Sequence, residues 1–385
     1  MSNGHAAGGN GAEGQGLKEK LRHAPKLMIG KHEFRFDPTD PDEELLNRAA
    51  KELRETPENV EEALRILNDL LDGEPDLDIP RNKEFLVRFL RPCKWYPEST
   101  FGLIKRFYKY KKTHPRYCEN LLPSNEAPVL RAGILTPLPH RTSDGVRVIL
   151  IEGGKKWKPK EISLDQFFRG VMLLLEAAVV EPRSQIAGVR VIIDMEGLSL
   201  SQVTYFTPSF AAAVVEFVQK CLPCRLKGIH IINQPFIFNM VFAFFKPFLQ
   251  EKLRKRIHFH GTDRNALKKY FDAEILPQRF GGELEFPYEP VGEPFVEYLS
   301  IFEDDFTVDG STAFEHRIYG PITTIKFRST GNNWITEQTK TNRFCCGRYG
   351  YPRTIERAIA CMMVSGNYVS ATHHYNTNPP PKMKE

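Results

Sequence analysis

Apolar residues recur with a helical period in the first part of the chain. Leu45, Ala49 and Leu53 are four residues apart, which places them on one face of a helix. The same period returns in three further segments, residues 59–73, 82–92 and 99–115. We therefore expect residues 42–120 to form an all-helical domain. The Gly-rich residues 1–41 are expected to be a disordered tail.

A different pattern occupies residues 125–287, where short runs of branched apolar residues alternate with long amphipathic segments. Strands are expected in "DGVRVILIE", "GVRVIIDMEG", "LKGIHIIN" and "RIHFHG". Two helices between them carry N-terminal capping signals, Ser163 with Gln166 and Thr207 with Pro208. Strands that alternate with helices predict a mixed β-sheet with flanking helices, so the chain is expected to be an α/β protein.

One segment of this domain, residues 236–249, is unusually rich in phenylalanine. A first apolar stripe at helical spacing consists of Phe238, Val241, Phe242, Phe245 and Leu249. A second stripe, on the other side of the same helix, consists of Ile237, Met240, Phe244 and Phe248. Such a helix is either buried on both sides in the core or meets lipid where it is not buried.

Positive charge is concentrated next to this helix. The whole chain has a net charge of +5, whereas residues 225–256 alone contain seven Lys or Arg residues and one acidic residue. Arg225 and Lys227 alternate at the start of a strand, so they share a face. Lys252 and Arg256 are four residues apart on an expected helix and share a face too. Two interpretations are open. The two pairs converge on one phosphorylated headgroup and bind it, or they form a basic face that contacts only water.

Composition narrows the cellular setting. No stretch reaches the roughly 18–20 apolar residues of a membrane-spanning helix, and the first residues lack the apolar core of a signal peptide. The seven cysteines are odd in number and scattered. We therefore expect a soluble cytosolic protein with reduced thiols. Its anionic partner is expected to be a membrane surface and not a nucleic acid.

The candidates for catalytic chemistry are weak. Cys221 and Cys224 have a redox spacing, but they follow a helix C-terminus, whereas reactive pairs occupy a helix N-terminus. His258 and His260 share a strand face, and no further ligand is spaced to complete a metal site. Asp194, after a strand, is more typical of a turn. We expect no enzyme activity, no cofactor and no metal.

The order of "VRVIIDMEG", "LKGIHIINQP", "KPFLQEKLRKRIHFHG" and "ILPQRFGGEL" resembles the CRAL-TRIO lipid-binding family. The resemblance is to the branch that includes α-tocopherol transfer protein, cellular retinaldehyde-binding protein and the clavesins. It covers about residues 42–290 and implies a helical domain followed by an α/β domain that encloses a hydrophobic lipid cavity. Residues 288–385 resemble no part of this family and are expected to be a poorly ordered extension.

The resemblance implies roles for the apolar helix and the basic residues. In this family the helix at 236–249 is a mobile gate over the cavity, and the residues of the first stripe are assigned to that gate. The positions that match the family's phosphoinositide site keep their charge, namely Arg225, Lys227, Lys252 and Arg256. A further arginine of that site falls at Cys93 here, and Arg91 or Lys94 are candidates to replace it.

The same resemblance implies an apolar lining for the cavity, formed by Phe168, Val171, Leu175, Ile193, Leu198, Val214, Phe217, Val218, Leu222 and Ile229. Val171 and Leu175 stand where the tocopherol-binding member of the family has serines. A more uniformly apolar ligand, or another arrangement of polar contacts, is therefore favoured over tocopherol itself.

Two functions are expected from these features. The first is a cytosolic protein that carries one hydrophobic lipid, similar to tocopherol, a retinoid or a phospholipid, and docks reversibly on phosphoinositide-containing membranes. The alternative is a phosphoinositide-binding adaptor in endosomal or Golgi trafficking, which has a protein partner and performs no net lipid transfer.

Overall fold

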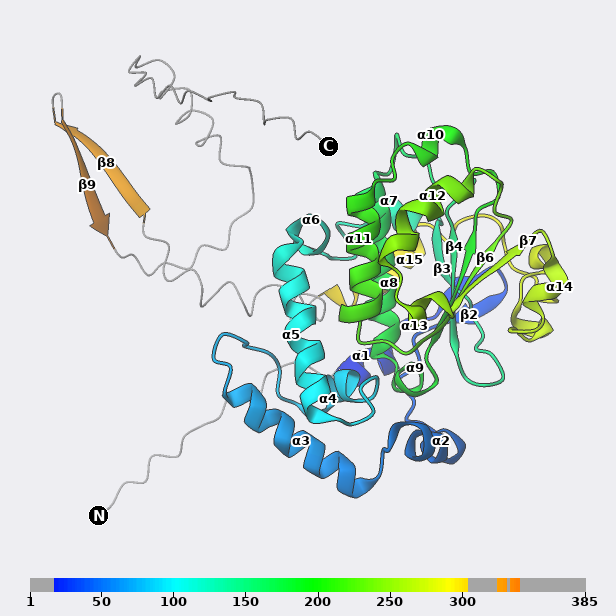
Figure 1. Cartoon of the computed structure of the whole chain (residues 1–385), viewed down its shortest axis with the longest axis horizontal. Coiled ribbons are helices and arrows are strands. Elements are labelled where there is room, and N and C mark those ends of the chain that lie inside the picture. The colour runs from blue at the N-terminus through cyan, green and yellow to red at the C-terminus, as the bar shows by residue number, and fades with distance from the viewer. Residues whose placement is uncertain (1–16, 304–323, 331–332, 340–385) are drawn as a thin grey trace, which may run out of the picture. The chain divides into compact units, whose positions relative to one another are not determined.

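The computed structural model describes residues 17–303, 324–330 and 333–339 (Figure 1). The expectations for residues 1–16 and for most of residues 288–385 therefore fall outside the described residues. In the C-terminal part, β8 (Thr324–Thr330) and β9 (Asn333–Thr339) pair as an antiparallel hairpin, in a unit separate from the rest of the chain.

The predicted helical region is confirmed. It contains α2 (Glu43–Leu53), α3 (Pro57–Asp72), α4 (Lys83–Leu90) and α5 (Pro97–Thr113). The Asp42 carboxylate accepts a hydrogen bond from the backbone N–H of Leu45, which caps α2. Leu45, Ala49 and Leu53 are all buried, as their spacing along one helical face requires.

Residues 24–36, expected to belong to a disordered tail, are part of the folded core. After α1 (Leu17–His23), the strands β1 (Leu27–Ile29) and β2 (His32–Phe34) form a hairpin. The rings of Phe34 and Phe36 pack on Tyr298 of α15 (Glu293–Ser300), whose hydroxyl accepts the Phe36 N–H at 2.8 Å. The expected disorder is wrong for both segments, because each supplies apolar side chains that bury those of the other.

A mixed five-stranded sheet forms the centre of the α/β region, as predicted. Its strands are β3 (Leu135–Pro137), β4 (Arg147–Glu152), β5 (Val189–Asp194), β6 (Leu226–Ile232) and β7 (Ile257–Gly261), in that order across the sheet. β3 is antiparallel to β4, and the other neighbours are parallel. Every residue of β4 is buried, as is typical of a strand covered on both faces.

Helices cover one face of this sheet, chiefly α8 (Leu164–Val180) and α11 (Pro208–Glu216) (Figure 1). The predicted caps are present: Ser163 and Gln166 form a capping box on α8, and Thr207 caps α11. On the other face Val148, Leu150 and Ile192 pack against residues of the segment 267–280. None of the described helices is long and apolar enough to cross a bilayer.

Short elements connect these layers. They are α6 (Pro115–Cys118), α7 (Ala127–Arg131), α9 (Pro182–Ala187), α10 (Leu200–Val203), η1 (Phe217–Cys221), α12 (Phe238–Phe245), η2 (Lys246–Phe248), α13 (Glu251–Arg254), α14 (Arg264–Leu267), η3 (Ala273–Ile275) and η4 (Gln278–Phe280).

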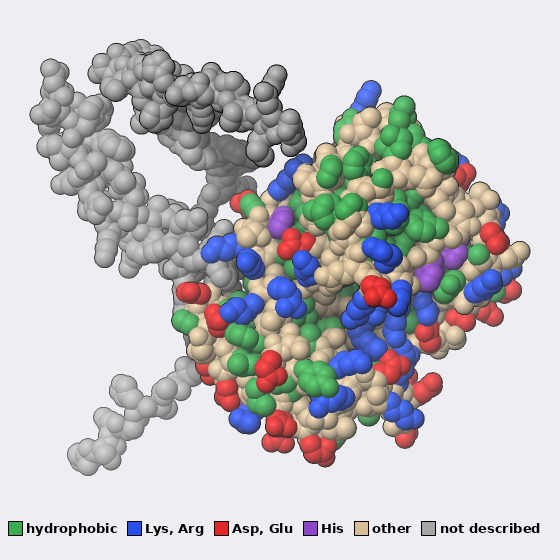
Figure 2. Space-filling model, viewed as in Figure 1, with side chains coloured by type: hydrophobic (Ala, Val, Ile, Leu, Met, Phe, Trp, Pro, Cys, Tyr) green, Lys and Arg blue, Asp and Glu red, His purple; other side chains and the backbone are tan. Residues whose placement is uncertain are grey.

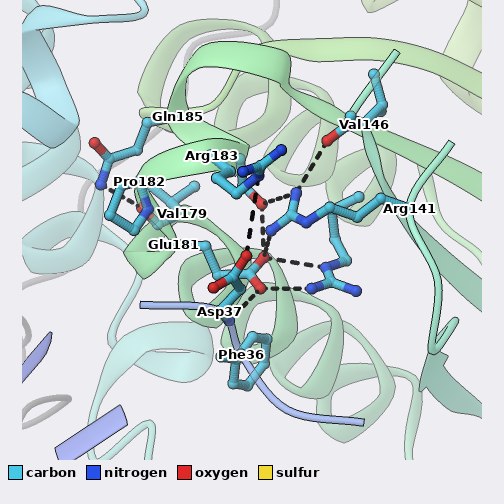
Figure 3. A network of polar contacts seen from close by, with 12 residues as sticks. Phe36, Asp37, Arg141, Val146, Val179, Glu181, Pro182, Arg183 and Gln185 are labelled. Carbon is cyan, nitrogen blue, oxygen red and sulfur yellow. Dashed lines mark hydrogen bonds and ion pairs between the residues drawn. The ribbon is translucent and has the colours of Figure 1, made fainter. Parts of the chain in front are cut away.

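A fully buried carboxylate, Glu181, joins the N-terminal segment to the sheet domain (Figure 3). Its oxygens accept from the guanidinium of Arg147 at 2.6 and 3.1 Å, from the Ser184 hydroxyl at 2.6 Å and from the Asp37 N–H at 2.8 Å. Arg141 lies 2.9 Å away as a second cation. Burial alone would raise the pKa of Glu181, but the two arginines outweigh it and lower this pKa to about 2.

We expect Glu181→Gln to lower the free energy of unfolding by about 3–5 kcal/mol at pH 7, because it leaves two buried cations without their anion. The carboxylate contributes stability above its ordinary pKa and loses it as pH falls toward 2. The difference from wild type in urea unfolding should therefore shrink below about pH 4.5. Glu293→Gln, which breaks the exposed pair with Arg131, is the matched control and should change little. Equal stability of Glu181→Gln and wild type would contradict this role.

Candidate functional site

Two adjoining apolar cavities lie between the sheet and its covering helices. The larger, called the α12 cavity, has a volume of about 170 Å³ and is lined by Ile193, Met195, Phe206, Val214, Val215, Val218, Ile229, Ile231, Phe238, Val241, Phe242, Phe245, Leu249, Leu253 and Ile257. The smaller, called the α8 cavity, has a volume of about 130 Å³ and is lined by Leu135, Ile149, Ile151, Val171, Leu174, Leu175, Val191, Ile193, Val214, Val218, Leu222, Leu226 and Ile229. Every residue in both linings is apolar.

The cavities share one wall, made by Ile193, Val214, Val218 and Ile229. Each volume alone is below the ~300–1,000 Å³ that is typical of ligand pockets, and the two joined reach only the lower limit of that range. A long-chain ligand therefore requires the wall or the covering helix to move.

The phenylalanine-rich helix covers the α12 cavity with one of its two apolar stripes. The entire first stripe lines the cavity. On the opposite side Met240 is 55% exposed, and Phe236, just before the helix, is 90% exposed. The helix is shorter than the predicted 236–249: α12 ends at Phe245, and the turn η2 that follows contains Pro247, which lacks the N–H of a continuing helix.

Most of the cavity residues implied by the family resemblance line one or both cavities. They are Val171, Leu175, Ile193, Val214, Val218, Leu222 and Ile229. Three others do not. Phe168 and Phe217 face the N-terminal helices, where the Phe217 ring lies 5.4 Å from that of Tyr110 on α5. Leu198 packs in a small core cluster with Phe238 and Val241.

The structure adds lining residues that the sequence did not single out. They are Leu135, Ile149, Ile151, Leu174, Val191, Met195, Phe206, Val215, Leu226, Ile231, Leu253 and Ile257. On the strands, the period-two alternation indicates which residues share a face, but the face that borders a cavity depends on which helices cover it.

The four predicted basic residues lie at one end of the sheet and are called here the basic cluster. Arg225 precedes β6, and its guanidinium donates to the Ile186 carbonyl and to the Glu52 carboxylate, the latter at 2.7 Å. Lys227 Nζ lies 3.8 Å from the same carboxylate. Burial, and then Arg225, lower the pKa of Lys227. The two residues therefore do face the same way, as their alternation predicts.

The expected helical face for Lys252 and Arg256 is wrong in part. α13 ends at Arg254, and Arg256 lies beyond the helix, where its carbonyl accepts the Ile229 N–H at 2.8 Å. Burial, and then the charge of Arg225, lower the pKa of Arg256. Lys252 itself lies within α13.

Neither proposed substitute for the missing arginine at Cys93 is shown in that role. Arg91 is buried and committed to Glu55 at 2.7 Å and to the Gln185 side chain at 2.7 Å. Lys94 takes a positive φ of 55° in the turn after α4. Burial raises the pKa of the Cys93 thiol, and the Thr100 side chain and the charges of Arg106 and Lys252 offset only part of this effect.

Hydrophobic and basic side chains meet on one face of the molecule. Figure 2 shows hydrophobic side chains gathered over α10 and α12, with Lys and Arg side chains gathered below them over α13 and α9. Leu200 of α10 is exposed, like Met240 and Phe236. This arrangement suits an anionic membrane surface, where apolar side chains enter the interface and cations meet headgroups.

The residues considered above as weak candidates for catalytic chemistry have structural explanations. Burial raises the pKa of both Cys221 and Cys224 to about 12, so reactive thiolates do not form near neutral pH. Asp194 accepts from the Glu196 N–H at 3.0 Å and from Asn233 Nδ2 at 3.0 Å, which fits the turn interpretation.

The paired histidines of β7 share a face, as predicted, and the structure adds a third ring. His230 of β6 packs against both rings in a near-parallel orientation, with its Nδ1 atom 3.0 Å from His260 Nε2. Tyr270 packs on all three rings. Burial, followed by the charges of His258 and His260, lowers the pKa of His230 to about 3, so this ring is neutral and packed near pH 7.

The chain is similar in sequence to known lipid-binding proteins. The model of the CRAL/TRIO domain family matches residues 131–282. Alpha-tocopherol transfer protein-like from Mus musculus is 33% identical over 273 residues, which cover 69% of this chain and 79% of that protein. Clavesin-2 from Homo sapiens is 31% identical over 249 residues, which cover 64% and 76%. The crystal structure of Sfh5 covers 51% of this chain and 68% of its own, at 18% identity and a TM-score of 0.35.

The placement of two adjacent residues leads to a stability prediction. Phe217→Ala should cost about 3–5 kcal/mol of unfolding free energy, since Phe217 is fully buried between α5 and α8. Val218→Ala should cost only about 1–2 kcal/mol, because it enlarges a cavity that already exists. Urea unfolding of both variants measures the difference, and equal losses would contradict these placements.

Proposed function

Because this chain belongs to the CRAL/TRIO family of lipid-binding proteins, we propose that it carries one hydrophobic lipid in the joined α12 and α8 cavities. We further propose that it docks on phosphoinositide-containing membranes through the basic cluster, as a cytosolic protein that binds membranes reversibly. No covalent chemistry is involved. The observation that carries the proposal is a wholly apolar cavity beneath a helix with one apolar face inward and another outward.

The cavity lining supports an apolar cargo. A long-chain lipid that moves several hundred Å² of apolar surface out of water gains on the order of 10 kcal/mol at about 25 cal/mol per Å². Val171 and Leu175 offer no hydrogen bond, and no polar side chain is among the lining residues. A buried hydroxyl on the cargo would therefore be left without a side-chain partner from this lining, which favours uniformly apolar lipids.

Loading is proposed to occur through displacement of α12. The closed cavities are too small for a long-chain lipid, so the helix that forms their cover must shift. At a bilayer its outward residues Phe236 and Met240 enter the interface, which offsets the loss of packing over the cavity. The basic cluster then holds an anionic headgroup while the lipid exchanges.

The small closed volumes favour a second candidate, a phosphoinositide-binding adaptor in endosomal or Golgi trafficking. In that case the headgroup is the signal, a further protein is the partner, and the cavity carries no cargo. Headgroup binding without a stoichiometric lipid distinguishes the adaptor from the carrier.

Mass spectrometry of lipid extracted from protein incubated with cytosolic extract should find one hydrophobic species at near-equal stoichiometry. Val218→Phe, which places a ring in the wall that the cavities share, should reduce this occupancy severalfold. Val60→Phe, the same change at a partly buried position of α3, is the control and should leave occupancy unchanged. An empty wild-type protein would exclude the carrier and favour the adaptor.

Reversing Lys252 and Arg256 together to Glu should weaken binding to phosphoinositide vesicles by at least about tenfold, since each cation near the surface contributes about 1 kcal/mol. Bound lipid should stay in place, because neither residue lines a cavity. Lys268→Glu with Lys269→Glu makes the same charge change at two exposed residues after α14 and serves as the control. Unchanged vesicle sedimentation of the first variant would rule out the headgroup role.

A further inference from the structure

The basic cluster is already occupied by an anion from the protein itself. The Glu52 carboxylate, at the end of α2, lies 2.7 Å from an Arg225 nitrogen and 3.8 Å from Lys227 Nζ. Arg48, one turn earlier on α2, lies 3.1 Å from its other oxygen. Three cations from two parts of the chain thus converge on one carboxylate, which remains half exposed to solvent.

The geometry of α2 directs this carboxylate to the cluster. Leu45, Ala49 and Leu53 bury one face of the helix, which leaves Arg48 and Glu52 on the flank toward β6. Arg48 is fixed by its hydrogen bond to the Asp144 carbonyl at 2.7 Å. Glu52 is therefore presented by an anchored helix, unlike a carboxylate on a free surface loop.

The Glu52 carboxylate offsets part of the mutual repulsion among the cations of the basic cluster. The cations of the cluster repel one another, and Arg225 lowers the pKa of both Lys227 and Arg256 in addition to burial. Partial burial raises the pKa of Glu52, but Arg225, Lys227 and Arg48 together lower it. Other nearby acids have partners of their own: Asp144 pairs with Arg190 at 3.1 Å, and Glu251 with Lys255 at 2.7 Å.

We propose that Glu52 is a specificity-determining residue of the headgroup site, because a ligand must displace its carboxylate from Arg225 and Lys227 in order to bind. This inference rests on the proposed headgroup role of the basic cluster. A phosphate monoester carries about −1.5 to −2 charges and three acceptor oxygens, so it outcompetes one carboxylate. A headgroup of single net charge, such as that of phosphatidylserine, does not. Glu52 thereby selects multiply phosphorylated headgroups over the general negative charge of a membrane.

The test measures binding of Glu52→Gln to three probes: phosphatidylcholine vesicles with phosphatidylinositol bisphosphate, matched vesicles with phosphatidylserine at equal charge, and soluble inositol trisphosphate. Binding to phosphatidylserine vesicles should tighten by about tenfold, and binding to both phosphorylated probes by about threefold. Selectivity for the phosphoinositide therefore falls. Glu52→Asp keeps the charge on a shorter side chain and should give an intermediate result.

Glu62→Gln, which removes the same charge from an exposed position of α3, is the matched control and should leave all three affinities unchanged. Thermal unfolding checks that each variant is folded. Equal gains for Glu52→Gln and Glu62→Gln would overturn the proposal, since the effect would then be one of net charge. A gain on vesicles without a gain on soluble inositol trisphosphate would overturn it too, because the headgroup site itself would be unaffected.

The Lys252 and Arg256 double reversal separates this inference from the proposed function. If that reversal abolishes binding while Glu52→Gln binds like wild type, the basic cluster is the headgroup site but Glu52 does not restrict it. If the reversal has no effect, the proposed headgroup function fails, and the inference fails with it.

Discussion

The buried carboxylate of Glu181 is the constraint on which the other contacts of this region depend. It begins α9, and that short helix offers its backbone to cations from three directions. Arg91 donates to the Pro182 carbonyl, Arg225 to that of Ile186, and Arg48 to that of Ala187. The helical region, the basic cluster and the sheet thus meet around one helix, and the ion pairs of Glu181 with Arg147 and Arg141 hold that helix in place. Removing a buried charge that has several partners lowers the stability of the fold strongly, because each buried cation would lose the negative charge that it pairs with.

The phenylalanine-rich helix is packed differently. Its inward stripe lines a cavity, and Met240 on its outer side lies exposed to water. Side chains that line a void lack dispersion partners on that side. In the proposed carrier function the two helices have different roles. The contacts around α9 hold the headgroup site in a fixed geometry, and displacement of α12 lets the lipid enter and leave the cavities.

Several parts of the fold were predictable because local physics decides them. The period of Leu45, Ala49 and Leu53, the caps at Ser163 and Thr207, and the first apolar stripe of the segment 236–249 all reappear in the structure. The predictions that were wrong have a common cause, namely contacts between residues far apart in the sequence. Phe34 and Phe36 are buried in contact with Tyr298, which lies more than 260 residues away in the sequence. Phe217 and Val218 are neighbours in sequence, yet one faces α5 and the other a cavity.

By itself the sequence determined the alternation of helices and strands, the apolar stripes of the segment 236–249 and the concentration of basic residues in 225–256. These follow from spacing and composition, which act within a few residues. Only the tertiary structure decided which side chains border a cavity, and that Glu52 meets Arg225 across 173 residues of chain. Helix periodicity gives the face on which Glu52 lies, but the cations it meets depend on how α2 packs on α9. That packing is a long-range outcome of burial, because apolar surfaces far apart in sequence leave water together.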